Sequence, residues 1–301
     1  MALSIHTNYS ALTTNTALNK SNNALATNQQ RLGTGFRINS AADDAAGLQI
    51  ATRLNAQSRG MGVAMRNTSD AISMLQTAEG AFNEMTDIVQ RMKDLATQAA
   101  NGTNGENDLK ALQSEYDELG KELGNIVKNT KYAGEELFQR TTGKLAIAAG
   151  VNFQIGASEA EKLTFNVSTA LNALTADATG LGSVSATYKD VMLAAPTGTA
   201  VGTELTAAGT ANTTITALTT VLDDIGTVRA SLGANINRLN HTSNNLANMK
   251  DNTEMAKGRI MDADFAIESA NMSKNSMLMQ SGISMLKQAG QMPGMVMSLL
   301  G

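Results

Sequence analysis

The stretch RLGTGFRINSAADDAAGLQIATR, from Arg31 to Arg53, decides the fold of this sequence. Its two early glycines interrupt a leucine-spaced helical segment and predict the end of a first helix. Ser40 is placed to cap the free backbone N–H groups of a second helix, and Asp43 three residues later completes a capping-box pattern. Asp43 and Asp44 also place negative charge in the first turn, where the helix dipole favours it by roughly 0.3–1 kcal/mol. The stretch therefore predicts a joint between two helical layers.

The segments at the two ends of the chain each carry a stripe of apolar residues at helical spacing, which we call the seam. On the N-terminal side an apolar residue recurs every seven positions, and the C-terminal segment repeats the same spacing. Burying such side chains yields about 1.5–3 kcal/mol each, while ordering an arm costs about 1–2 kcal/mol per residue. One arm should therefore not fold alone, and the two termini should meet. The predicted seam consists of Leu18, Leu25, Leu32, Leu278, Met285, Met292 and Leu299.

Between these arms, three segments carry a sustained heptad repeat of apolar residues, which is the pattern of packed long helices. A turn rich in Gly and Asn at 101–108 separates the first two segments, and so short a connection makes the helices antiparallel neighbours. The third segment has a matching seam, so the three together predict an inner helical bundle. The repeats are Ala71, Ala78, Met85, Met92 and Ala99, then Leu109, Tyr116 and Leu123, then Leu218, Ile225, Leu232, Leu239 and Leu246.

The middle of the chain changes from helical to strand periodicity. Residues 151–156 and 162–167 alternate apolar and polar side chains across a short link, which predicts a β-hairpin. Residues 171–212 consist largely of Ala, Thr, Gly and Ser with few apolar anchors. That composition fits either a small exposed insertion or a loosely ordered loop.

These patterns predict a mainly α protein. We expect a long antiparallel helical bundle or coiled coil formed by both termini, with a small β-hairpin region and a short central insertion. The expected regions are a terminal coiled-coil core domain of residues 1–44 plus 257–301, an inner helical-bundle domain with the hairpin of residues 45–170 plus 213–256, and a short variable surface insertion of residues 171–212.

The composition excludes several classes of protein. Aromatic residues make up only 3% of the 301 residues and Trp is absent, which favours a long, thin helical body over an aromatic-rich globular core. The net charge of −4, with both signs interspersed, offers no basic face for nucleic acid. Cysteine is absent, so a secreted form must be stabilised by packing or assembly rather than by disulfides. We also expect no Sec-type signal peptide and no membrane-spanning segment.

Catalysis, cofactor binding and metal binding have little support in the sequence. His6 and His241 are its only histidines, and they lie far apart without a cysteine or a metal-ligand motif nearby. Asp262 and Asp264 are more simply interpreted as solvated or salt-bridged acids than as a catalytic pair of carboxylates. We therefore predict no catalytic, cofactor-binding or metal-binding residues.

Three stretches of the sequence are distinctive in their exact order of residues. They are LSIHTNYSALTTN at 3–15, RINSAADDAAG at 37–47 and RIMDADFAIESANMSKNSMLMQSGISMLKQAGQMPGMVMSLL at 259–300. Together they resemble the terminal signatures of bacterial flagellins, the subunits of the flagellar filament. The resemblance covers roughly residues 1–170 and 213–301, so the chain looks like a short flagellin with little or no outer variable domain. One departure is the methionine-rich C-terminal arm, which packs adaptably but is more sensitive to oxidation.

The resemblance implies a structural protein that polymerises with copies of itself into the filament and serves motility. It implies unfolded export through the flagellum's own type III secretion channel, an export chaperone, and contacts with the filament cap and junction proteins. The protein would then be secreted and would lie in the extracellular filament. The paired terminal helices would form the inner core, with the seam residues joining neighbouring subunits.

A segment of the first heptad-repeat helix resembles another known part of flagellins. Its segment QRMKDLATQ at 90–98 is similar to the part of many flagellins that vertebrate Toll-like receptors recognise. Arg91 and Leu95 match the principal contacts, and Glu115 on the next helix matches a third. The resemblance implies a receptor contact through these three residues, while a solvated helix charge explains Arg91 equally well.

Other functions stay open at this point. A hook–filament junction-type protein shares the terminal seams but does not elongate, and a non-polymerising coiled-coil interaction protein forms an oligomer of fixed size. An enzyme requires a cluster of titratable groups that the sequence does not show. A membrane-surface role for the methionine-rich arm is disfavoured, because only Lys274 and Lys287 lie on its polar face.

Overall fold

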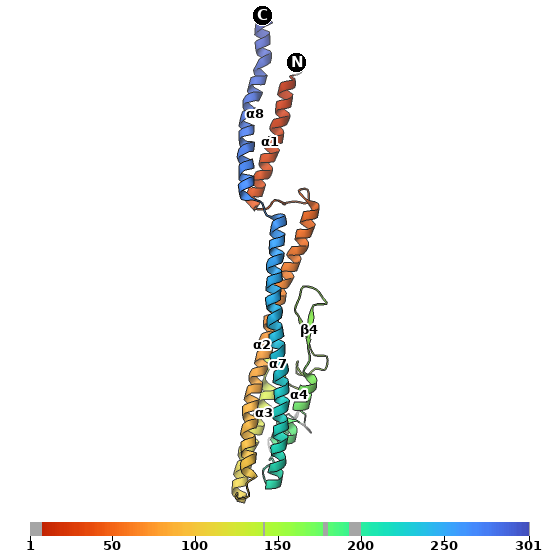
Figure 1. The fold of residues 1–301 in the computed structure, drawn as a ribbon, viewed down its shortest axis with the longest axis vertical. Helices are drawn as coiled ribbons and strands as arrows, with labels where there is room; N and C mark the ends of the chain where they lie inside the picture. Colours follow the sequence, from red (N-terminus) through yellow and green to blue (C-terminus); the bar gives the residue numbers. More distant parts are fainter. Residues whose placement is uncertain (1–7, 141, 177–179, 193–199, 301) are drawn as a thin grey trace. The chain divides into compact units, whose positions relative to one another are not determined.

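The chain is mainly α-helical, as the sequence predicted. The computed structural model describes residues 8–140, 142–176, 180–192 and 200–300, with the side chains of 292–300 outside the described set (Figure 1).

Contacts between Cα atoms divide the chain into two compact units. The terminal unit contains Met1–Arg59 and Lys250–Gly301, and the bundle unit contains Gly60–Met249. Two long helices, α2 (Ala45–Ala99) and α7 (Ala208–Met261), contribute to both units.

In the terminal unit, the two ends of the chain form a pair of helices, α1 (Tyr9–Thr34) and α8 (Phe265–Leu300), which lie side by side (Figure 1). Asn8 caps the start of α1, because its side-chain oxygen accepts the backbone N–H of Ala11 at 3.0 Å. Gly35 ends α1 in the left-handed conformation, with φ of 75°, which glycine adopts without steric cost. The predicted meeting of the two termini is confirmed.

The joint between α1 and α2 differs from its prediction at one point. Helix α2 begins at Ala45 rather than at Ser40. The Asp43 carboxylate accepts the Ser40 backbone N–H at 2.8 Å and the Ser40 hydroxyl at 3.0 Å, which holds the pKa of Asp43 below its usual value. Asp44 caps the helix instead, by accepting the Gly47 N–H at 2.8 Å. The predicted cap at Ser40 was wrong because the carboxylate of Asp43 competes for the serine hydroxyl.

The bundle unit is built on α2, α7 and a shorter helix, α3 (Glu106–Asn129), as the heptad repeats predicted (Figure 1). The predicted repeat positions on α2 and α7 within this unit are all buried, with exposed fractions of at most 6%. Phe82 packs beside Phe138 in this core, with ring centroids 4.9 Å apart. On α3, Tyr116 and Leu123 are fully buried.

Two small antiparallel sheets follow α3. The first pairs β1 (Lys131–Tyr132) with β2 (Glu135–Glu136). The second pairs β3 (Val151–Gln154) with β4 (Lys162–Phe165), in a register that sets Val151 opposite Phe165. The alternating side chains Phe153, Leu163 and Phe165 face the core, which confirms the predicted hairpin.

The segment after the hairpin packs more closely than its composition suggested. It forms three short helices, α4 (Ser168–Leu174), α5 (Leu181–Val184) and α6 (Ala186–Met192). Several of its large side chains, among them Tyr188 and Leu205, are fully buried against the bundle, whereas Val201 is 74% exposed. Neither of the two interpretations left open for residues 171–212 predicted this burial. A few large apolar side chains are enough to pack the short helices here, because small residues allow the helices to lie close together.

Such an approach occurs where α6 crosses α3 at Gly120 and Gly124. A Cβ atom at Gly120 would clash with the Ser185 hydroxyl, and one at Gly124 would lie 2.7 Å from Val191 Cγ1. Both approaches are closer than real Cβ contacts, so these glycines allow α6 to lie directly on α3.

We predict that Gly124→Leu lowers the free energy of unfolding by about 2–3 kcal/mol, because its Cβ alone would lie 2.7 Å from Cγ1 of the stiff β-branched Val191 side chain. Urea unfolding followed by circular dichroism measures the change. Gly226→Leu is the matched control, since a Cβ atom at Gly226 of α7 would meet nothing within 4 Å. Equal stability of the two variants would contradict the prediction.

Candidate functional site

The surface of the α1–α8 pair contains a shallow apolar groove. Leu18 of α1 and Leu278 and Met285 of α8 line it, in a volume of about 260 Å³. Gly282 lets the two helices approach, because a Cβ there would lie 2.9 Å from Leu18 Cδ1. Leu278 is 49% exposed and Met285 is 58% exposed, so much of the apolar surface around this groove faces solvent.

The structure therefore brings together three of the seven predicted seam residues. Leu25 and Leu32 are half-buried on α1. Met292 and Leu299 have side chains outside the described residues.

Further apolar side chains on the same helices are exposed beyond the groove. Tyr9 is 68% exposed and Leu12 61% on the first turn of α1, while Phe265 is 70% and Ile267 59% at the start of α8. Ile283, in the middle of α8, is 45% exposed. Exposed apolar patches of this kind mark surfaces that bind another protein.

A buried polar cluster fixes the register of α1 against α8. Arg31 donates to Glu268 Oε1 at 3.0 Å, and the Glu268 side chain is only 9% exposed. The Asn28 amide fits between the helices when its nitrogen donates to Glu268 Oε2 and its oxygen accepts from Asn275 Nδ2, both at 3.1 Å. Such a cluster is satisfied in one alignment of the two helices only.

Sequence reasoning missed this cluster, although a signal was present. Asn28 lies three residues after Leu25 and four before Leu32, which is a core position of the same heptad seam. A polar residue at a core position is a known device for specifying register, and it predicts a polar partner on the opposite helix.

Two linkers join these helices to α2 and α7, and they pair with each other. The backbone N–H of Arg37 donates to the Met261 carbonyl at 2.6 Å, and that of Ala263 donates to the Gly35 carbonyl at 2.9 Å. Asp264 then caps α8 by accepting the N–H of Ala266 at 2.9 Å. Asp264 is thus a helix cap rather than the solvated or salt-bridged acid expected from the sequence.

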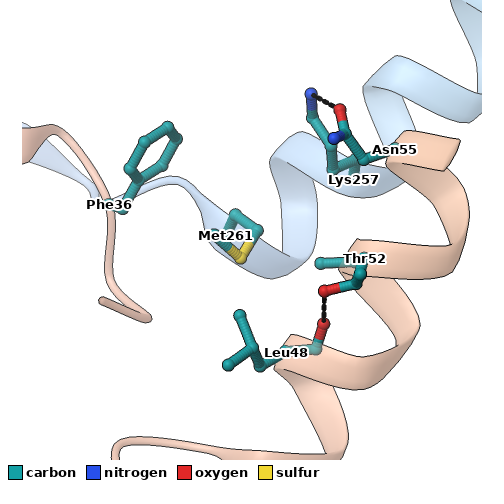
Figure 2. Close-up of a pocket in the computed structure, with 7 residues that line it drawn as sticks. Phe36, Leu48, Thr52, Asn55, Lys257 and Met261 are labelled. Carbon is teal, nitrogen blue, oxygen red and sulfur yellow. Dashed lines mark hydrogen bonds between the residues drawn. The ribbon is translucent and has the colours of Figure 1, made fainter. Parts of the chain in front are cut away.

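A small pocket lies beside the linkers, in the terminal unit. Figure 2 shows Phe36, Leu48 and Met261 around it, with Lys257 donating to Asn55 Oδ1 at 3.4 Å along one side. Its volume is about 230 Å³, and Phe36 is 41% exposed. This pocket suits an apolar side chain and offers no arrangement of nucleophile and base.

The three residues that resemble receptor contacts differ in accessibility. Arg91 on α2 donates through Nε and a terminal nitrogen to Glu115 Oε1 on α3, at 3.0 and 2.6 Å, and both side chains are about half exposed. Leu95 is only 1% exposed and lies in the bundle core. Leu95 therefore presents no surface for direct contact in this arrangement, because its side chain fills the heptad seam.

A polar cleft of about 530 Å³ lies between α3 and the loop that precedes α7. Asp117 accepts the Gly202 N–H at 3.2 Å, and Gln113 donates to Asp117 at 2.9 Å and to Glu204 at 2.9 Å. Burial raises the pKa of Asp117, and the nearby Glu204 carboxylate raises it further, while Gln113, Gly202 and Lys121 act against these effects. Burial likewise raises the pKa of the Tyr116 hydroxyl.

We predict that Asp117→Asn removes a pH dependence of stability. Because the pKa of Asp117 is higher in the folded state than the ordinary value of 3.8, the folded state binds its proton more tightly than the unfolded state does. This contribution is fully present below pH 3.8 and is lost as the pH rises through the raised pKa. Wild type should therefore lose stability relative to Asp117→Asn as the pH rises from 3.8 through the raised pKa.

Urea midpoints at several pH values measure this difference. Asp223→Asn, at an exposed site on α7, is the control for removing one carboxylate. Parallel pH profiles for wild type and Asp117→Asn would contradict the prediction.

The described residues offer little for catalysis. His241 is exposed on α7, and His6 lies outside the described part of the chain. Within that part no group of three or more His, Cys, Asp or Glu side chains is arranged to hold a metal ion. No described helix is both long and apolar enough to cross a membrane.

Comparison with known proteins decides the family. Residues 5–143 match the bacterial flagellin N-terminal helical region, and residues 215–300 match the bacterial flagellin C-terminal helical region. Flagellin A of Vibrio anguillarum is 34% identical over an alignment that covers the whole of both chains. The chain belongs to the bacterial flagellin family. This flagellin is a structural subunit of the extracellular flagellar filament, where it polymerises with copies of itself and serves motility.

Other relatives agree with this assignment. Polar flagellin C of Vibrio parahaemolyticus is 34% identical and flagellin A of Vibrio cholerae 33% identical, each over the full length of both chains. The alignments span 393 and 388 positions against the 301 residues of this flagellin, so the relatives carry segments that it lacks.

Among solved structures, a flagellar hook-associated protein of Vibrio parahaemolyticus shares the fold. Its TM-score is 0.58 at 12% identity, and the match covers 73% of this flagellin and all of the other chain. A crystal structure of Bacillus cereus flagellin is 31% identical, covers 60% of this chain and 88% of its own, and has a TM-score of 0.46.

Proposed function

We propose that this flagellin joins its filament through the α1–α8 pair, and that the predicted seam residues bury their side chains against neighbouring copies. One observation carries this proposal: the two terminal helices pair with each other yet leave Leu278 and Met285 about half exposed beside an apolar groove. The groove and the exposed side chains around it form a surface that a second copy can cover.

The same surface bears on how the protein reaches the filament. We infer that the chain is exported unfolded through the flagellar type III channel, since nothing in its fold depends on disulfides. Before export, the apolar arms would bind each other between chains, so we propose a chaperone that covers them. At the filament the cap and junction proteins are the proposed neighbours of the first and last subunits.

The three predicted regions fit this role. Residues 1–44 plus 257–301 are the proposed core of the filament, and 45–170 plus 213–256 the layer around it. Residues 171–212 are proposed as the segment that varies. We infer no catalytic role. Asp117 and Glu204, two neighbouring carboxylates of the described bundle, both accept backbone N–H groups, which is a structural use of these side chains.

Receptor recognition is a second proposed interaction. The Arg91–Glu115 ion pair is half exposed across α2 and α3, so it is accessible to a vertebrate Toll-like receptor. Arg91→Glu should lower receptor signalling by purified monomer, whereas Lys110→Glu, which reverses an exposed charge elsewhere on α3, should not. Equal signalling by both variants would remove the ion pair from the proposed contact.

Seeded polymerisation tests the main proposal. Purified full-length chain and a variant lacking residues 1–40 and 260–301 are incubated with filament seeds and viewed by negative-stain electron microscopy. Long tubular filaments from the full chain alone are the expected result. Discrete particles from both chains would favour the junction-type or fixed-oligomer alternatives, because those proteins do not elongate.

A further inference from the structure

We propose that Met285 is an oxidation-sensitive site, at which conversion of the thioether to the sulfoxide blocks the assembly of free subunits. This inference rests on the proposed role of the α1–α8 surface in assembly. It adds to that role a chemical modification by a peroxide.

The methionines whose side chains the structure describes range from fully buried to more than half exposed. Met277 is 66% exposed and Met285 58% exposed on α8. Met85 and Met92, in the core of the bundle unit, are 1% and 0% exposed. A dissolved oxidant reaches exposed thioethers first, so Met277 and Met285 of α8, together with the 54% exposed Met255 of α7, should oxidise before Met85 and Met92.

Met285 differs from Met277 in its surroundings. Met285 lines the groove on the α1–α8 pair together with Leu18 and Leu278, whereas Met277 is not among the lining residues. Two hydroxyls of the groove, on Thr13 and Thr14, already donate to backbone carbonyls of their own helix at 2.8 and 2.7 Å. These two hydroxyls are thus already engaged within α1, while the hydroxyls of Ser21 and Ser281 also line the groove.

The reaction needs only a peroxide. A lone pair of the Met285 sulfur forms a bond to one peroxide oxygen while the O–O bond breaks, so sulfur loses two electrons and hydrogen peroxide is reduced to water. The proton of the transferred oxygen goes to the departing hydroxide. The product carries a strong S–O dipole in place of an apolar thioether.

That dipole opposes assembly. When a neighbouring copy covers the groove, the sulfoxide oxygen must give up its water, a cost in free energy that the apolar thioether does not have. We expect the subunit concentration needed for growth to rise roughly tenfold or more. A subunit already in the filament is shielded, because its Met285 is buried against its neighbour.

The test compares wild type, Met285→Leu and Met277→Leu after the same exposure to hydrogen peroxide. Leucine has nearly the volume of methionine and does not oxidise, so both variants should fold. The growth concentration of each protein after treatment is compared with its own value before treatment, which removes any direct effect of the substitution on assembly. Peptide mass spectrometry measures oxidation at each methionine, with Met85 and Met92 as internal buried controls. Seeded elongation then gives the growth concentration of each protein.

We expect peroxide to block wild type and Met277→Leu, while Met285→Leu retains most of its elongation. Treatment of oxidised wild type with methionine sulfoxide reductase and a dithiol should restore growth. Equal loss of elongation in wild type and Met285→Leu would overturn the proposal for Met285.

One more variant separates this proposal from the assembly surface on which it rests. Unoxidised Met285→Glu places a permanent charge at the same position. Normal filaments from Met285→Glu would overturn both the assembly role of the position and its oxidation sensitivity. Loss of filaments from Met285→Glu, together with peroxide resistance of wild type, would leave the assembly surface standing and overturn the oxidation site alone.

Discussion

Replacing Leu278 by glutamate is expected to abolish filament growth while the bundle unit stays folded. In the free subunit this side chain is 49% exposed, so a carboxylate there remains hydrated and changes stability by at most about 0.5 kcal/mol. In an assembled interface the same carboxylate would be buried without a partner, at a cost of about 3–5 kcal/mol. That cost raises the concentration needed for growth by more than about 100-fold.

Seeded elongation measured by light scattering and electron microscopy tests this result, with urea unfolding as the check on the fold. Gln280→Glu is the matched control, because Gln280 is exposed on α8 and is not among the residues that line the groove. Filaments of normal length from Leu278→Glu would contradict the proposal that the α1–α8 pair is the assembly surface.

The second large effect concerns the bundle. We expect Phe82→Ala to lower the free energy of unfolding by about 3–5 kcal/mol, because the ring is fully buried and packs beside Phe138. Alanine leaves a cavity where α2 meets the rest of the core. Urea unfolding followed by circular dichroism measures the loss.

The control for this substitution is Phe265→Ala. Phe265 is 70% exposed on α8, so its removal should change stability by no more than about 0.5 kcal/mol. If Phe82→Ala unfolds at the same urea concentration as Phe265→Ala, the bundle core does not depend on the aromatic pair.

The long helices could be predicted from the sequence because their signal repeats many times. Leu218, Ile225 and Leu232 each occupy the same face of one helix, so an error at any single position changes nothing. The hairpin of β3 and β4 was predicted for the same reason, from the alternation that ends in Phe165. Pattern-based inference works where many residues obey one geometric rule.

Features that depend on a few specific contacts were missed. The start of α2 depends on which of Ser40, Asp43 and Asp44 captures a given hydrogen bond, and a spacing rule does not rank these competitors. The burial of Leu95 also required knowledge of what covers it, because Leu95 was not among the predicted repeat positions of this helix. The packing of α6 depended on two glycines that carry no pattern of their own.

The candidate site was predicted in part. Leu18, Leu278 and Met285, three of the predicted seam residues, line one groove on α1 and α8, while their role in assembly stays a prediction. The polar cluster around Glu268 was not predicted, because its partners lie on helices that are adjacent only in the folded chain. A polar residue at a seam position was the one available sign.

The pairing of α1 with α8 also sets an order of events during folding. Asn8 donates to the carbonyl of Ala289, a contact between residues 281 positions apart in the chain. Closing a loop of such length costs conformational entropy, and a folded bundle shortens the loop, so we expect the bundle to fold before the helix pair closes. Whichever end of the chain emerges first, its terminal helix has no partner until the other terminal helix is also present. The surface proposed for assembly is thus completed only when synthesis or delivery of the whole chain has finished.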